Sequence, residues 1–235
     1  NFNQSVLVEG IGNNSSMADY WVDISNGLYS DELESYVPDA YLAWQTYVID
    51  SLSGYYTEYG TVYSNYGDDP GSIYGQRIRR LISNKGYTGE HAFTVGGNWS
   101  NKIYFGATFG ITRLNYSYQY QHMESTDYDL PSKFTSFNYT YYSDNFGTGY
   151  TFKLGTIVRP VENLRLGFAF HSPTIYRITE TISDNISTYF SDEPLPYEAS
   201  NNAEGYNYAL TTPFRVMAGA AFQINKIALL SAEYE

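Results

Sequence analysis

The chain has 235 residues, a formal net charge of −12 at pH 7, 27 tyrosines and no cysteine. So acidic a chain does not suit nucleic acid, whose phosphates require a basic surface, and the lack of cysteine excludes a disulfide scaffold and a thiolate metal site. The aromatic, glycine-rich composition favours an all-β protein, in which the acidic charge belongs either to solvated loops or to a surface that captures cations.

The first part of the chain is predicted to be a short strand followed by a long loop. Residues 2–8 have a strand-like composition, whereas residues 10–87 show no alternation and contain two predicted short helices. Ser16 and Asp19 have the spacing of a capping box at the start of the first helix, and Gly27 follows at a suitable C-cap position.

The second predicted helix begins at Pro38, which suits a first helical turn. An apolar stripe at helical spacing follows it, made by Tyr41, Leu42, Trp44, Val48 and Ile49. The stripe has two interpretations. It is either a core that attaches a large extracellular loop to the strands, or a surface groove for hydrophobic ligands lined by Tyr41, Trp44 and Val48.

The remainder, residues 88–235, is predicted to form hairpins of long strands. Short turns are predicted at 98–102, 159–163 and 224–226, and long acidic connections that contain proline at 124–133 and 188–204. Each hairpin therefore has a short turn at one end and a long loop at the other. The strands between them have on the order of 20 residues, against about 5 or 6 in a typical soluble protein.

Near the short turns, each strand alternates between apolar and small residues. Tyr150, Phe152 and Phe168 stand on one parity, whereas Gly155 and Gly167 stand on the other. No apolar run approaches the ~18 residues of a spanning helix, so a membrane span in this chain must consist of strands. Long strands, short turns at one end and a glycine-rich second face are typical of an antiparallel transmembrane β-barrel, so we expect the apolar face to contact lipid.

The pattern changes farther from the short turns. After Ile111 the apolar residues move to the other parity, where Leu114, Tyr116, Tyr118 and Tyr120 stand. We interpret this change as a break in the phase of the strand. The tyrosines beyond the break, together with Trp99 in a short turn, are predicted to form aromatic girdles at the membrane interfaces.

Three runs of the sequence carry a family resemblance: NKIYFGATFGITRLNY, KLGTIVRPVENLRLGFAFHSPTIY and FRVMAGAAFQINKIALLSAEYE. They resemble the FadL family of outer-membrane transporters for long-chain fatty acids and other hydrophobic compounds, particularly its Bacteroidetes-type members. The elements K-L-G, R-P, L-R-L-G and S-P-T occur in this order on one predicted hairpin, and the resemblance runs through most of the chain.

This resemblance implies a fourteen-stranded barrel with an N-terminal plug, of which the sequence supplies about seven strands. Open sheet edges in hydrocarbon leave backbone groups unpaired, at a cost of several kcal/mol each. We therefore expect the chain to be a segment of a longer protein.

The implied function is a channel in the bacterial outer membrane for passive uptake of hydrophobic molecules, with capture by extracellular helices and lateral release. The expected ligand is a fatty acid or a detergent-like compound, the expected surroundings are outer-membrane lipid, and no cofactor is required. The alternative is a FadL-like barrel that acts as a protein-binding or secretion-associated component. A continuous apolar tunnel would favour transport, and a lumen packed solid would favour the binding role.

Three basic residues are candidates for ligand binding. Lys153, His171 and Arg215 lie at similar distances from the short turns on three consecutive strands, so we expect them at one depth inside the barrel. A basic group at that depth can hold the carboxylate of a fatty acid. Alternatively, these residues form structural pairs with acidic residues of the lumen, namely Glu90, Glu233 or Glu235.

Catalysis is not expected. His91, His122 and His171 have no nucleophile motif such as G-x-S-x-G beside them, and no two of them have the spacing of metal ligands. On the parity of the strands His91 is expected to face lipid, and His122 lies far out in a strand extension.

Overall fold

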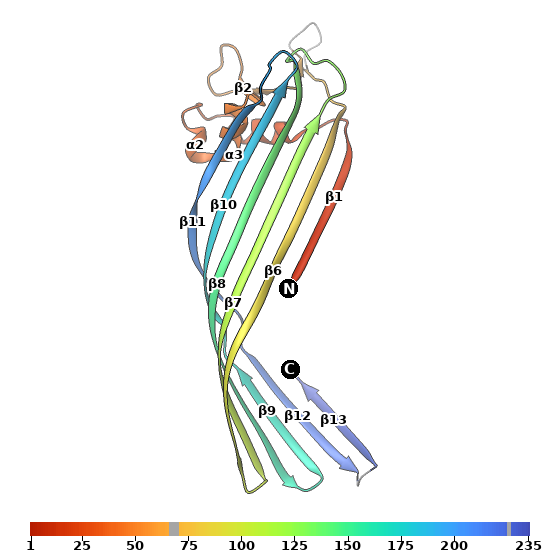
Figure 1. The fold of residues 1–235 in the computed structure, drawn as a ribbon, viewed down its shortest axis with the longest axis vertical. Coiled ribbons are helices and arrows are strands. Elements are labelled where there is room, and N and C mark those ends of the chain that lie inside the picture. The colour runs from red at the N-terminus through yellow and green to blue at the C-terminus, as the bar shows by residue number, and fades with distance from the viewer. Residues whose placement is uncertain (66–70, 225–226) are drawn as a thin grey trace.

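The computed structural model describes residues 1–65, 71–224 and 227–235, apart from the side chains of residues 65 and 202–204. Most of the chain forms one antiparallel β-sheet that curls into a half-barrel, with a small helical layer at its upper end (Figure 1). The expected all-β fold class is therefore confirmed. The turn predicted at 224–226 lies mostly outside the described residues.

Nine strands make up the sheet: β1 (Phe2–Gly12), β6 (Gln76–Trp99), β7 (Ile103–Ser125), β8 (Phe134–Val161), β9 (Leu164–His171), β10 (Ile175–Phe190), β11 (Tyr197–Thr211), β12 (Arg215–Ile224) and β13 (Ala228–Tyr234). Among them, β6, β7 and β8 have 24, 23 and 28 residues, so the prediction of unusually long strands is confirmed. These three strands run the full height of the sheet (Figure 1).

At two further places in the sheet, one strand position is shared by two shorter strands. β10 pairs with the first part of β8, and β9 pairs with its last part, so β9 and β10 lie end to end in one strand position. β11 and β12 share the next strand position in the same way. The interruptions are residues 172–174 and 212–214, which contain Pro173 and Pro213, and proline cannot donate a ladder hydrogen bond. With β1 and β13 at the edges, the described sheet has seven strand positions, in agreement with the expected number of about seven strands.

The turns at the lower end are tight. Between β6 and β7, Ser100 and Asn101 both adopt positive φ angles of 52° and 54°, and the Lys102 N–H donates to the Trp99 carbonyl at 3.0 Å, which closes a tight β-turn. The side chain of Asn98 stabilises the turn by accepting a hydrogen bond from the backbone of Asn101 at 2.9 Å. At the upper end, the connection predicted at 188–204 is much shorter, because β10 continues to Phe190 and β11 begins at Tyr197.

The described part of the segment between β1 and β6 contains three helices and four short strands: α1 (Met17–Ser25), α2 (Leu33–Tyr36), α3 (Pro38–Gln45), β2 (Ile49–Ser51), β3 (Tyr59–Thr61), β4 (Ser64–Asn65) and β5 (Gly71–Ser72). The predicted capping box of α1 is present, with Ser16 as N-cap and Asp19 as its partner, and Pro38 occupies the first turn of α3. The predicted boundary at residue 87 is wrong, because β6 already begins at Gln76. We call residues 13–65 and 71–75 the cap.

The cap packs on one face of the sheet, which we call the inner face. Trp21 of α1 is fully buried and lies against Phe137 and Tyr139 of β8, with ring centroids 5.4 Å apart in each case. Leu33, Leu42 and other apolar residues of the cap complete this core. The hydrophobic core of the described chain therefore lies between the cap and the upper part of the inner face.

The opposite side of the sheet is the outer face. Residues of β6, β7 and β8 can be assigned to one face or the other because the pairing of these strands is continuous. No irregularity interrupts the register of β7 with β8 from Ile103 to Ser125, so successive residues alternate faces along the whole strand. The predicted phase break after Ile111 is therefore wrong. Tyr116 and Tyr118 lie on the inner face, where they line a cavity below the cap, and they do not form an interfacial girdle.

Replacing Trp21 with Ala should detach the cap from the sheet. The side chain is fully buried, and an emptied aromatic site costs about 3–5 kcal/mol. Limited proteolysis of the cap should become faster in this variant. Tyr20→Ala is the matched control, because Tyr20 is the neighbouring residue of α1 and is half exposed; equal cleavage of both variants would contradict this account of the core.

Candidate functional site

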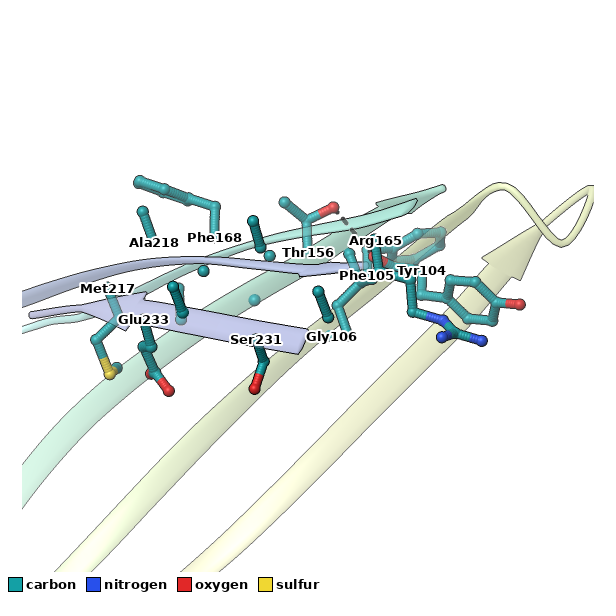
Figure 2. Close-up of a pocket in the computed structure, with 18 residues that line it drawn as sticks. Tyr104, Phe105, Gly106, Thr156, Arg165, Phe168, Met217, Ala218, Ser231 and Glu233 are labelled. Atoms are coloured by element: carbon teal, nitrogen blue, oxygen red, sulfur yellow. Dashed lines mark hydrogen bonds between the residues drawn. The ribbon is translucent and has the colours of Figure 1, made fainter. Parts of the chain in front are cut away.

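The lower inner face is a shallow groove lined mostly by small residues, with Tyr104, Arg165 and Met217 among the larger ones. Its lining comes from β7, β8, β9, β12 and β13, and the cavity has a volume of about 650 Å³. Figure 2 shows the alternation at close range: Met217, Ser231 and Glu233 project to one side of the sheet, and Phe168 and Ala218 project to the other. The groove therefore belongs to the face that carries small and polar residues.

Glycine keeps this groove open. A side chain at Gly106, Gly155 or Gly167 would meet no atom closer than 3.7 Å, so no neighbouring side chain fills the space above these residues. Four glycines contribute to the lining: Gly106, Gly155, Gly167 and Gly219. The groove is consequently smooth and able to accept an apolar body against the sheet.

The three predicted basic residues lie side by side above this groove. His171 of β9 is the register partner of Lys153 in β8 and of Arg215 in β12. Since neighbouring strands are about 4.8 Å apart, the three residues form one row across the inner face. Their expected common depth is confirmed, whereas binding of a ligand by this row remains a prediction.

Two members of the row are already paired with carboxylates. The ammonium of Lys153 lies 2.7 and 2.8 Å from the two carboxylate oxygens of Glu90, which reaches across β7 from β6. Gly110 permits this reach, because a Cβ there would lie 2.7 Å from the Glu90 carboxylate. Arg215 pairs with Glu235 at 3.3 Å. These contacts fit the structural alternative, and an anionic ligand would have to compete with them.

A second cavity of about 470 Å³ lies on the inner face in the upper half of the sheet. Four of its ten lining residues are tyrosines, three are aliphatic, and none is lysine or arginine: Leu114, Tyr116, Tyr118, Tyr141, Ser143, Asn145, Ile178, Glu180, Tyr208 and Leu210. Tyr208 donates to Asn145, the Asn145 amide donates to Ser143, and Ser143 donates to Glu180, with distances of 3.1, 2.9 and 2.7 Å. This chain of hydrogen bonds fixes the polar groups of an otherwise apolar wall.

The cap is attached to the sheet by a buried carboxylate. Glu124 of β7 is fully buried and accepts hydrogen bonds from the Ser16 hydroxyl at 2.6 Å, the Met17 backbone N–H at 2.8 Å and the Tyr63 hydroxyl at 2.9 Å. Ser16 and Met17 stand at the N-terminus of α1, where the helix dipole favours a negative charge. One side chain of the sheet thus binds two separate parts of the cap.

Arg80 and His122 extend this network on the sheet side. Arg80 Nε donates to His122 Nδ1 at 3.2 Å, so His122 Nε2 carries the proton that it donates to Glu124 at 2.9 Å. Sequence reasoning missed this network. The available signal was parity, because His122 and Glu124 continue the inner-face series of Tyr116, Tyr118 and Tyr120.

The predicted groove of the second helix is mostly packed. Val48 follows α3 and is fully buried in the core, and Ile49 belongs to β2 instead of the helix. Tyr41 and Trp44 are half buried and stack on each other with ring centroids 5.9 Å apart. Val48 therefore has no surface to offer a ligand, and the packing interpretation holds for this residue.

No group of three or more histidine, aspartate or glutamate side chains within the described ranges is arranged to hold a metal ion. His91 pairs with Ile111 and lies on the outer face, as its parity predicts. Among the described helices, none has the length and apolar character needed to cross a membrane.

Comparison of the chain with protein-family models, with curated proteins and with solved structures finds no match. The assignment of function therefore rests on the geometry of the sheet.

Attachment of the cap should depend on pH through Glu124. Burial raises the pKa of this carboxyl, but hydrogen bonds from His122, Met17 and Ser16 outweigh burial and hold the pKa below its ordinary value of 4.5. A depressed folded-state pKa stabilises the attached cap above pH 4.5, and this stabilisation is lost as the pH falls through the folded-state pKa.

The test is proteolysis of the cap as a function of pH in Glu124→Gln. This variant should lose about 1.5–3 kcal/mol of attachment at neutral pH, because the charge-assisted hydrogen bonds that the carboxylate accepts become weaker, neutral ones, and its acid-dependent release should flatten. Asp23→Asn on the exposed side of α1 is the control. An unchanged acid release in Glu124→Gln would contradict this role.

Proposed function

We propose that the sheet is part of the wall of a β-barrel in a bacterial outer membrane. The observation that carries this proposal is the outer face of the lower sheet, where large apolar side chains are exposed side by side. They include Phe93, Phe105, Phe109, Phe152, Leu154, Phe168, Val216 and Phe222. Soluble proteins rarely expose so large an apolar patch, and lipid is the solvent that suits it.

The height of this band agrees with a membrane. On β7 it extends over about nine residues, from Ile103 to Ile111, and a tilted strand of that length covers roughly 23 Å against the ~25 Å of an outer-membrane barrel. The edge strands β1 and β13 require pairing partners in lipid, so the proposal includes further strands that close the barrel. The resemblance to the FadL family supports the same architecture.

Within this barrel we assign passive transport of hydrophobic molecules. The glycine-lined groove and the aromatic upper cavity both lie on the inner face, beneath the cap. The candidate place for lateral release is the pair of proline interruptions between β9 and β10 and between β11 and β12. Pro173 and Pro213 weaken strand pairing there at the same level of the sheet. The outer-membrane location, the transport function and the absence of enzymatic activity are parts of one proposal.

The narrower proposal is a fatty acid as the transported ligand, with its carboxylate held by the row of Lys153, His171 and Arg215. A charge-assisted hydrogen bond there is worth ~1.5–3 kcal/mol. In a double variant, Lys153→Gln with Arg215→Gln, binding of a fatty acid should weaken while binding of its methyl ester stays nearly unchanged. Equal changes for acid and ester would remove the row from the binding site and leave it with a structural role.

Replacing Phe152 with Arg should destabilise the inserted barrel by about 2–4 kcal/mol, because it places a charge on the lipid-facing band. Phe146→Arg is the matched control. Phe146 lies on the same strand and the same face and is 52% exposed, but it stands above the band among polar residues. Unfolding in lipid bilayers measures both effects, and similar costs for the two variants would argue against a membrane boundary between them.

A further inference from the structure

On β7 and β10 the outer face changes from apolar to polar at one level of the sheet. The last apolar row consists of Ile111 of β7, Tyr150 of β8 and Ile175 of β10, which are register partners. The next row on the same face, two residues farther along each strand, is Arg113, Thr148 and Arg177. Above it the outer face of β7 is polar, with Asn115, Ser117, Gln119 and Gln121. Two arginines therefore stand at the upper edge of the apolar band.

These arginines have a defined mutual position. Both are register partners of Thr148, so they lie on either side of it, with Cα atoms roughly 10 Å apart. Arg113 and Arg177 are both exposed, and neither forms an ion pair with any residue that the structure describes. Higher on the same face, Arg77 and Arg79 do have carboxylate partners, in Asp127 and Glu9.

We propose that Arg113 and Arg177, with the Thr148 hydroxyl between them, bind a phosphorylated lipid headgroup of the outer leaflet. This inference rests on the proposed membrane location, which puts their row at the level of the headgroups. Guanidinium groups form paired, charge-assisted hydrogen bonds with phosphate oxygens, and long side chains at roughly 10 Å spacing can converge on one headgroup.

The apolar row directly below selects a lipid over a free phosphate ion. Ile111, Tyr150 and Ile175 offer a surface for acyl chains within about 7 Å of the arginine row, which is the distance between residues two apart on a strand. An anionic lipid satisfies both rows at once, whereas inorganic phosphate satisfies only the upper one. The net charge of −12 makes the chain as a whole repel anions. The two arginines without carboxylate partners give this row a local positive charge that attracts an anion.

The test is binding of lipid A, a bis-phosphorylated glycolipid, to the full-length protein in phosphatidylcholine nanodiscs. In Arg113→Gln with Arg177→Gln, affinity for lipid A should fall about tenfold or more. A double control, Lys85→Gln with Lys102→Gln, removes the same charge from exposed positions outside the row and should keep affinity within about twofold. Arg113→Lys with Arg177→Lys keeps the charge without the planar fork and should give an intermediate loss.

Several results would overturn the inference. They are equal losses in the arginine and control variants, equal binding of dephosphorylated lipid A, or competition by inorganic phosphate as strong as that of the lipid. Insertion into neutral phosphatidylcholine is measured separately. Failure to insert would contradict the proposed function itself, whereas normal insertion with unselective lipid binding would contradict only the headgroup site.

Discussion

The uninterrupted antiparallel register of β6, β7 and β8 is the constraint on which the rest of the structure depends. Each strand keeps one parity on each face over more than twenty residues, so a residue's number decides its surroundings. The same register places apolar side chains in one band on the outer face and small residues opposite them. It also brings Lys153 into line with His171 and Arg215 on the neighbouring strands.

The two ends of these strands serve different packing needs. In the lower half, the outer face carries large apolar side chains such as Phe105 and Phe168, whereas the inner face is lined mostly by glycine, alanine and other small residues. In the upper half, the inner face has to pack against the cap and takes the aromatic residues, among them Phe137 and Tyr139. A single buried carboxylate, Glu124, then connects the cap to the sheet at the N-terminus of α1.

Much of this arrangement could be predicted from alternation and local signals. The period-two pattern around Phe152 identified the outer face, and the capping box at Ser16 located α1. The pattern failed where one assumption was carried too far: apolar residues were expected on one face throughout, so Tyr116 and Tyr118 required a phase break that the strand does not have. Partners distant in sequence, such as Ser16 and Glu124, are brought together by packing of the cap and leave no local signal.

The most direct test of the lipid-facing outer band is a nitroxide scan along β8. The chain has no cysteine, so single cysteines introduced from position 150 to 155 can be labelled without background. In reconstituted barrels, collision with oxygen should be high at Phe152 and Leu154 and low at Lys153 and Gly155, with the reverse for a water-soluble nickel complex. An absence of this alternation, or the opposite alternation, would contradict the account.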